Sequence, residues 1–371
     1  MPAPVEDFTI GVEEEYQIVD PRTRQLRPRA GRVLDRAKEA VGEAVSNELY
    51  LSQIEIGTPV CRSLAEVRAE LVRLRRELIA AAGRAGCAIA AAGTHPTSRW
   101  QDQALTPKDR YRGIAEDYQQ LAREQIIFGC HVHVGIGDRE AAIQVMNRAR
   151  PWLAPMIALS ANSPFWQGVD TGYASYRTEL FQRFPTVNTP FVLASRAEYD
   201  ELIAALVATG MIEDASKIYW DVRPSSHFET LEFRVGDVCM TIDEAVMLAG
   251  LSRSLARTCL DRHRRGVEIV HERPELLRAA KWHASRYGLD GELVDVAARR
   301  SVPAADQVES FLAFLRPDLE AHGEWAEVAG LVRATIARGT GAARQRRAFG
   351  RAGRFEDVVD LIAAETAAGT S

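Results

Sequence analysis

Lysine is scarce in this chain: only Lys38, Lys108, Lys217 and Lys281 are found among its 46 basic residues. The 371 residues include 51 acidic ones, so the formal net charge is −5. A protein that binds nucleic acid through its surface needs an excess of positive charge, so we expect no nucleic-acid partner. Any anion bound in a site should be held mostly by arginine or by metal.

Long apolar runs and paired cysteines are also missing. The longest apolar stretch lies around residues 152–161, far short of the ~20 residues of a membrane span. Residues Met1–Asp7 do not resemble a signal peptide. The five cysteines are scattered and contain no C-x-x-C pair, which excludes a zinc ribbon and indicates free thiols. We therefore expect a cytoplasmic protein that does not contact membranes.

The common motifs of nucleotide and ester chemistry are absent. The chain has no G-x-x-x-x-G-K-[S/T] sequence, so it is not a P-loop enzyme. Gly135-Ile136-Gly137 lacks the third glycine of a dinucleotide-binding turn, and no G-x-S-x-G elbow is present.

The order of the expected elements favours an α+β fold. Strand patterns lie at 8–19, 49–56, 87–92, 129–137, 217–222 and 228–235, with helices at 63–83, 109–124, 138–159 and 196–209. Beyond residue 241 we expect helices only, at 241–265, 273–286, 304–315, 324–337 and 355–368. Because the strands do not alternate regularly with helices, a largely antiparallel sheet is expected. The basic cluster Arg344–Arg347 is interpreted as a solvated helix face.

Paired acidic residues occupy one face of the first expected strand. Side chains two residues apart on a strand share a face, so Glu13 and Glu15 project side by side while Glu14 points the other way. Neighbouring carboxylates repel each other unless a cation lies between them. Hard divalent ions such as Mg²⁺ or Mn²⁺ prefer carboxylate oxygens. The alternative is an exposed strand without a ligand.

The second expected strand repeats this pattern. Gln53 and Glu55 share one face, opposite two isoleucines, whereas Glu48 has the other parity unless the strand is bulged. An exposed polar face is again the alternative.

Two later strands carry histidine and arginine. His131 and His133 point the same way from an otherwise apolar strand, which is a common way to present metal ligands. Thr230, Glu232 and Arg234 also share a face. The last two could form a plain ion pair, or the carboxylate could hold metal while the guanidinium holds phosphate.

Together the four strands predict a sheet with one polar, metal-lined face and one apolar face covered by helices. Oxygen-rich ligands with one or two histidines suit Mg²⁺ or Mn²⁺ better than structural zinc. Several such ions in one site indicate polyphosphate chemistry.

Seven motifs in this order resemble the type-2 glutamate–cysteine ligase family, and within it the bacterial carboxylate–amine ligases. They extend from about residue 8 to residue 350, and as a set they are specific. The motifs are G-V-E-E-E-Y (11–16), Q-I-E-I-G-T-P (53–59), G-C-H-V-H-V-G (129–135), S-A-N-S-P (160–164), S-Y-R (175–177), T-L-E-F-R-V-G-D (230–237) and G-A-A-R-Q-R-R (341–347).

The resemblance implies a single glutamine-synthetase-like catalytic domain over residues 1–371. Its strand-bearing core would cover about 8–240, with helices on the outer face of a curved, mostly antiparallel sheet, and its helical C-terminal region about 241–371. Such enzymes use ATP and Mg²⁺ (or Mn²⁺) to phosphorylate a carboxylate, typically the glutamate γ-carboxylate. An amine, cysteine in the best-known case, then attacks the acyl phosphate. The resemblance also implies a homodimer.

The resemblance further implies a role for individual residues. Arg234 would act near the transferred phosphoryl group, and His133 would reach the nucleotide or substrate. Asn162 and Arg177 would line the substrate pocket, and Asp237 would lie behind it. The implied metal ligands are Glu13, Glu15, Glu55, His131 and Glu232.

Several points stay open in the sequence. His133, Glu55 and Glu15 are all candidates for the general base, and 160–168 and 166–183 are candidate lids. A metal-dependent amidohydrolase using His131 and His133, or an inactive binding module, are the alternative functions. A barrel amidohydrolase is disfavoured because βα repetition is missing.

Overall fold

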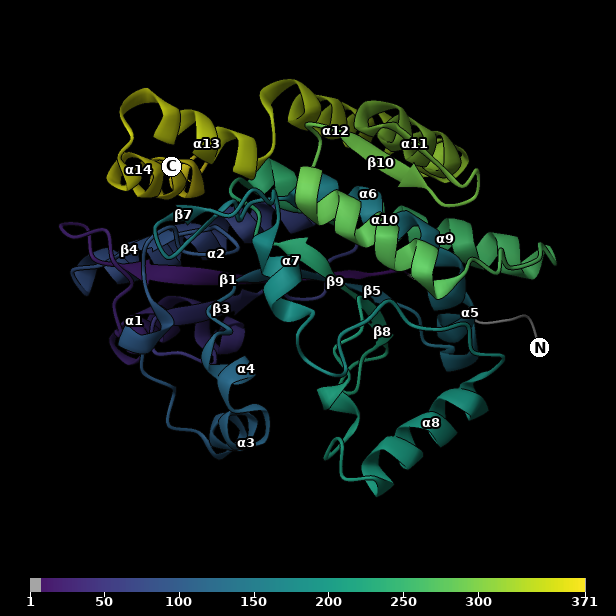
Figure 1. Cartoon of the computed structure of the whole chain (residues 1–371), viewed down its shortest axis with the longest axis horizontal. Helices are drawn as coiled ribbons and strands as arrows, with labels where there is room; N and C mark the ends of the chain where they lie inside the picture. The colour runs from purple at the N-terminus through teal and green to yellow at the C-terminus, as the bar shows by residue number, and fades with distance from the viewer. Residues whose placement is uncertain (1–7, 371) are drawn as a thin grey trace.

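A computed structural model describes residues 8–370 of the chain, and its centre is one curved antiparallel sheet (Figure 1). Within these residues, seven strands pair in the order β2-β3-β1-β5-β9-β8, with β4 beside the end of β1. The strands are β1 (Ile10–Val19), β2 (Val45–Asn47), β3 (Gln53–Gly57), β4 (Ala88–Ala90), β5 (Gly129–Gly135), β8 (Val222–Pro224) and β9 (Thr230–Asp237). Strands far apart in the sequence therefore become neighbours.

Helices cover one face of this sheet and leave the other open in its middle (Figure 1). On the covered face lie α2 (Leu64–Arg84), α5 (Arg139–Ala149), α6 (Leu153–Ser160) and α9 (Ile242–Arg264), with α10 (Pro274–Tyr287), α11 (Ala304–Ala321), α12 (Trp325–Arg338), α13 (Gly341–Ala352) and α14 (Phe355–Ala367) beyond them. Around the open face lie α3 (Asp109–Tyr118), α4 (Gln120–Arg123) and α7 (Tyr176–Phe181), whereas α1 (Ala30–Val41) packs beside α2 and α8 (Arg196–Ala208) packs on α5. No helix among residues 8–370 is long and apolar enough to cross a membrane.

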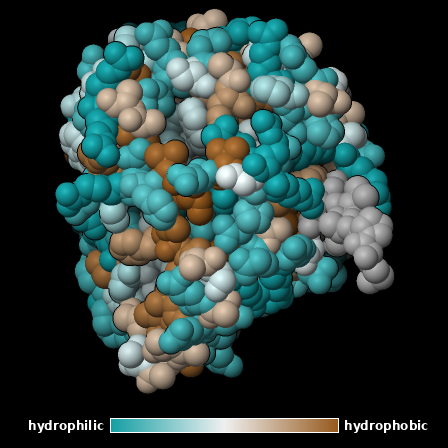
Figure 2. Space-filling view, turned by 90° about the vertical axis from the view of Figure 1, so that its right-hand side faces the viewer, coloured by the Kyte–Doolittle hydropathy of each residue, from teal (hydrophilic) through white to brown (hydrophobic). Residues whose placement is uncertain are grey.

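The main core lies between the sheet and the covering helices. Val12, Val132, Leu231 and Phe233 point from three strands into a cluster completed by the buried side of α9. Seen from the end of the molecule at the right of Figure 1, the surface is mostly hydrophilic, with hydrophobic patches near the middle (Figure 2). The elements are thus amphipathic, as the sequence pattern requires.

The predicted α+β class with a mostly antiparallel sheet is confirmed. The expectation of helices alone beyond residue 241 is wrong, because β10 (Glu292–Asp295) and β11 (Arg300–Pro303) form a hairpin there. Four-residue strands are too short to show a period in the sequence. A second small hairpin, β6 (Phe165–Trp166) and β7 (Val169–Asp170), also escaped prediction. The extent of one domain over the chain stays a prediction.

Two local interpretations are corrected by side-chain contacts. Residues 217–222 do not form a strand, since β8 begins only at Val222. The carbonyl oxygens of Ser216 and Ile218 accept hydrogen bonds from the guanidinium of Arg223 at 2.9 and 2.6 Å instead of from a neighbouring strand. Arg344 and Gln345 are not on a solvated face either. Both are buried, with Arg344 paired to Glu244 at 2.7 Å.

The pleat of β1 separates its three glutamates as predicted. Glu13 and Glu15 face the open side of the sheet, whereas Glu14 points into the covered side and is fully buried. There Arg75 of α2 binds Glu14 with two guanidinium nitrogens, one of them at 3.0 Å, and also donates to the carbonyl oxygens of Met240 and Cys239. One arginine therefore joins β1, α2 and the start of α9.

Removing this arginine should destabilise the fold strongly. In Arg75→Met the carboxylate of Glu14 stays buried without its partner, so we expect the free energy of unfolding to fall by about 3–5 kcal/mol. Urea unfolding followed by circular dichroism measures this. The surface pair of Arg24 and Asp360 provides the control, since Arg24→Ala should change the free energy of unfolding little. A loss as small as the control's would contradict the proposed role of Arg75.

His95 should make the stability depend on pH. Its Nε2–H donates to the carbonyl oxygen of Arg24, and its Nδ1 accepts from the amides of Thr97 and Ser98, so the buried ring is neutral. Burial lowers the pKa of His95 from 6.5 to about 4. As the pH falls, His95 is therefore protonated in the unfolded chain at a higher pH than in the folded protein. Stability present above pH 6.5 is lost progressively down to about pH 4, in total roughly 3 kcal/mol.

The measurement is the free energy of unfolding at pH 7 and pH 5 for the wild type and His95→Gln. The glutamine amide can donate and accept but does not titrate. We expect the variant to lose about 2 kcal/mol less between these pH values. Equal slopes would rule out His95 as the titrating group.

Candidate active site

A cavity of about 380 Å³ lies on the open face of the sheet and contains most of the predicted residues. The antiparallel register places them in rows across four strands. Glu55 of β3 lies beside Glu15, Glu13 lies beside His131 of β5, and His133 lies beside Glu232 of β9. Arg223 of β8 completes the last row. The expectation that these strands share one polar face is therefore met by the geometry.

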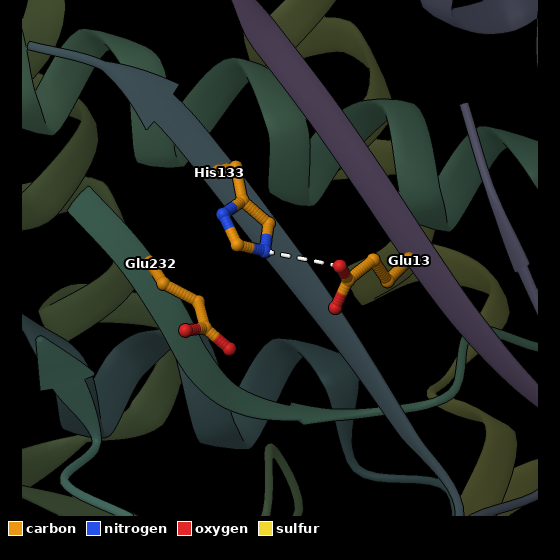
Figure 3. A group of neighbouring side chains, drawn as sticks. All are labelled: Glu13, His133 and Glu232. Carbon is orange, nitrogen blue, oxygen red and sulfur yellow. Dashed lines mark ion pairs between the residues drawn. The ribbon is translucent and has the colours of Figure 1, made fainter. Parts of the chain in front are cut away.

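Glu13 is held by both histidines. Its two carboxylate oxygens lie 3.3 Å from Nε2 of His133 (Figure 3) and 3.4 Å from Nδ1 of His131. Burial raises the pKa of Glu13, but hydrogen bonds from the two imidazoles outweigh it and hold this pKa well below its ordinary value. Burial also lowers the pKa of His131 to about 4, which keeps that ring neutral. The other side of His133 is fixed, since its Nδ1 lies 2.9 Å from the hydroxyl of Thr230.

Glu232 is bound by two arginines. Nε of Arg223 contacts one carboxylate oxygen at 2.8 Å, and Arg234 contacts the other. Burial would raise the pKa of Glu232, but Arg234 and Arg223 lower it strongly, so the carboxylate is ionised. Arg234 also lies over the rings of Phe181 and Tyr219 at 6.0 and 5.9 Å, within the range of cation–π contacts.

Three further carboxylates crowd the other end of the cavity. Burial, together with the charge of Glu48, raises the pKa of Glu15 to about 7. Burial and the neighbouring carboxylates, Glu13 first, raise the pKa of Glu55 well above its ordinary value. Their hydrogen bonds are few: Glu15 accepts from the amide of Gly129 at 2.6 Å, and Glu55 from the hydroxyl of Ser46 at 3.2 Å. A bound cation would relieve this repulsion.

Glu48 lines the same cavity, although its parity in the sequence argued against it. It lies in the turn between β2 and β3, ahead of the strand, so the strand's alternation does not apply to it. Its carboxylate accepts the neighbouring amide of Leu49 at 2.7 Å. A carboxylate in a turn gives no periodic signal, which is why sequence reasoning missed it.

The residues fit a divalent cation. One oxygen each from Glu13 and Glu232 and one nitrogen of His133 lie within 4.8 Å of one another, and the three side chains converge from neighbouring strands (Figure 3). His131 is equally close, with Nδ1 3.4 Å from Glu13 and 3.9 Å from Glu232. The Nε2 atom of His131 is buried without a hydrogen-bond partner. Such mixed carboxylate and imidazole donors suit Mg²⁺ or Mn²⁺.

Cationic residues occupy the remaining walls. Arg177 of α7 lines the cavity as expected, with its guanidinium 5.5 Å from the ring of Phe181 and its Nε unpaired. Lys108 and Arg110, at the start of α3, also line it and are exposed. These two were not predicted, because a loop followed by a helix start shows no pattern that marks a site.

Asn162 does not line the cavity. Its side-chain amide donates to the carbonyl oxygens of Ala91 and Val238, and its Oδ1 accepts from Gln345. A Cβ on Gly341 would lie 2.0 Å from that oxygen, so glycine is required where α13 begins. Asn162 therefore joins the sheet to α13.

Asp237 also lies behind the cavity, as expected. It accepts hydrogen bonds from the amide of Asn162 and from the hydroxyls of Ser163 and Ser175. Because residues 160–165 are buried around it, that part of the predicted lid is not free to open.

Comparisons with known proteins show the family of the chain. The model of glutamate–cysteine ligase family 2 (GCS2) matches residues 9–361. This chain belongs to that family. A Frankia alni protein, whose name assigns it provisionally as glutamate–cysteine ligase 2-2, is 45% identical over 96% of this chain and 97% of its own. A Rhodopirellula baltica relative with a similar provisional name is 44% identical over 96% of both chains.

The fold is shared with a solved ligase. The glutamate–cysteine ligase of Francisella tularensis, solved in complex with AMP, superposes with a TM-score of 0.73 over 97% of this chain and 89% of its own. Its sequence identity is 13%, so this likeness concerns the fold. The family membership predicted from the motifs is confirmed.

Replacing Glu232 should weaken metal binding. Glu232→Gln keeps the shape but removes the charge, and we expect the affinity for Mn²⁺ to fall at least about tenfold. Titration followed by electron paramagnetic resonance measures bound Mn²⁺ without any turnover. Glu229→Gln is the matched control, because Glu229 is exposed and does not line the cavity. Unchanged Mn²⁺ affinity in Glu232→Gln would exclude this residue from the metal site. Comparing the Mn²⁺ affinity of His131→Asn with that of His133→Asn identifies which imidazole is the ligand.

Proposed function

We propose that the protein is an ATP-dependent carboxylate–amine ligase that forms ADP. The supporting observation is the cavity itself, which is lined by five acidic and five basic side chains on one side of the sheet. The acids are Glu13, Glu15, Glu48, Glu55 and Glu232, and the cations are Lys108, Arg110, Arg177, Arg223 and Arg234. Membership of glutamate–cysteine ligase family 2 agrees with this function.

The balance of charges suits two anionic substrates only when divalent cations are bound. Two of the arginines, Arg223 and Arg234, are already paired with Glu232, whereas Glu15 and Glu55 have no cationic partner among the described contacts. Glu13, Glu15, Glu55, Glu232 and one of the two histidines, with Glu48 as an addition, would hold Mg²⁺ or Mn²⁺. Bound there, the ions supply positive charge that lets a carboxylate approach a triphosphate.

The protein's own residues then act on the reacting groups. In the first step a carboxylate oxygen forms a bond to the γ-phosphorus while the bond to the bridging oxygen breaks and ADP leaves. Arg234 and Arg177 are placed to stabilise the charge on the transferred phosphoryl group and to orient the carboxylate. In the second step the amine nitrogen bonds to the acyl carbon, phosphate leaves and the amine loses a proton. His133, Glu55 and Glu15 are the candidate acceptors of that proton.

The substrates belong to this proposal. The glutamate γ-carboxylate is the first candidate donor and cysteine a candidate acceptor, with other amines open. Asn162 would act on substrate only through the segment that it fixes, whereas Arg177 reaches the cavity directly. A cytoplasmic homodimer without nucleic-acid or membrane partners completes the proposal.

A screen for ADP release tests the function. Glutamate with a panel of amino acids and amines, ATP and Mg²⁺ or Mn²⁺ should release ADP above the background without acceptor. Mass spectrometry should identify an amide product. Arg234→Gln should lower turnover by about a hundredfold, the effect of losing one donor to transition-state charge.

Each alternative predicts a different result. A metal-dependent amidohydrolase would consume an amide without ATP, and an inactive binding module would release no ADP with any pair. If no carboxylate–amine pair stimulates ADP release with either metal, the ligase proposal fails.

A further inference from the structure

A buried ion pair lies directly behind the arginines of the cavity and has no part in the function described so far. Nζ of Lys281, in α10, lies 2.6 Å from Oδ1 of Asp221, and both side chains are more than nine-tenths buried. The hydroxyl of Thr189 donates to the other oxygen, Oδ2, at 2.7 Å. Both oxygens of Asp221 therefore have a partner.

Asp221 is attached to the strand that carries Arg234. Its carbonyl oxygen accepts the backbone amide of Arg234 at 2.9 Å. Side chains from Arg177, Arg234, Asp221 and Lys281 line one small cavity of about 10 Å³. These four residues therefore lie close together.

One nitrogen of the Arg234 guanidinium group has no hydrogen-bond partner. One of its terminal nitrogens binds Glu232, but its Nε is buried without a hydrogen-bond partner. A buried guanidinium nitrogen gains from any carboxylate oxygen that becomes free nearby. Asp221 does not compete for Arg234 at present because Lys281 and Thr189 occupy it.

We infer that Lys281 is a positioning residue, which occupies Asp221 so that Arg234 stays with Glu232 and faces the reacting phosphoryl group. The inference rests on the proposed ligase function. Without the ammonium group, Asp221 is a buried carboxylate that lacks its cationic partner, and it competes with Glu232 for Arg234. A lysine is suited to this task because its single ammonium group pairs with one oxygen, and the pair stays buried behind the cavity.

Breaking the pair from its two sides distinguishes this role from a merely structural one. In Lys281→Met the carboxylate is freed, and we expect kcat for ADP release to fall at least about tenfold with a smaller change in KM for MgATP. In Asp221→Asn the pair is also broken, but no carboxylate is left to divert Arg234. We therefore expect kcat within about threefold of the wild type in this variant and in Lys281→Met/Asp221→Asn.

Controls and a second measurement keep the outcomes separate. Arg253 is buried and paired with Glu324 between α9 and α12, so Arg253→Met should lower the unfolding midpoint but keep kcat. A crystal structure of Lys281→Met should show Arg234 within hydrogen-bond distance of Asp221, whether or not turnover is detected. Lys281→Gln replaces the methionine variant if that one does not fold, because glutamine also lacks the charge.

The inference is overturned if Lys281→Met retains a kcat as high as Asp221→Asn, if the double variant is no faster than Lys281→Met, or if Arg234 stays on Glu232 in the variant structure. A wild type without carboxylate-dependent ADP release would instead refute the proposed function. The crystal structure would then still decide whether Lys281 positions Arg234.

Discussion

The site depends on the pleat of β1, which sends alternate glutamates to opposite faces of the sheet. Glu13 and Glu15 both point into the cavity because Glu14, on the opposite face of β1, is held there by its ion pair with Arg75. A shift of β1 by one residue would bury the two site acids and expose the third. The buried pair with Arg75 ties this register to α2 and to the start of α9.

Antiparallel pairing of the other strands with β1 and β5 then brings the remaining polar side chains of the site beside Glu13 and Glu15. β3 and β5, which pair with β1, and β9, which pairs with β5, add Glu55, the two histidines and Glu232 to the same face, so acids and imidazoles that lie far apart in the sequence meet. Arginines enter from the other edge and from α7, and residues behind the sheet, Asp221 and Asp237 among them, hold their surroundings in place. The cavity is thereby built from rigid elements, which suits the preorganisation of charge that phosphoryl transfer needs.

Alternation along strands allowed most of the cavity to be predicted. Glu13, Glu15, Glu55, His131, His133, Glu232 and Arg234 all line it, because each lies within or next to a regular strand whose period of two assigns its face. Glu48, Lys108 and Arg110 lie in a turn and at a helix start, where no period exists. The hairpin β10–β11 was missed for a related reason, since its strands have only four residues each. Asn162 was placed at the substrate by its motif, but its hydrogen bonds join the sheet to α13.

The four lysines illustrate what the sequence determines and what only the tertiary structure decides. The sequence by itself determined that lysine is scarce, that four strands share one polar face, and to which family the chain belongs, since all three depend on local order along the chain. Only the tertiary structure decided that Lys108 reaches the cavity and that Lys281 pairs with Asp221 behind Arg234. Those contacts join residues far apart in the sequence, and the packing of α3 and α10 on the rest of the fold determines them.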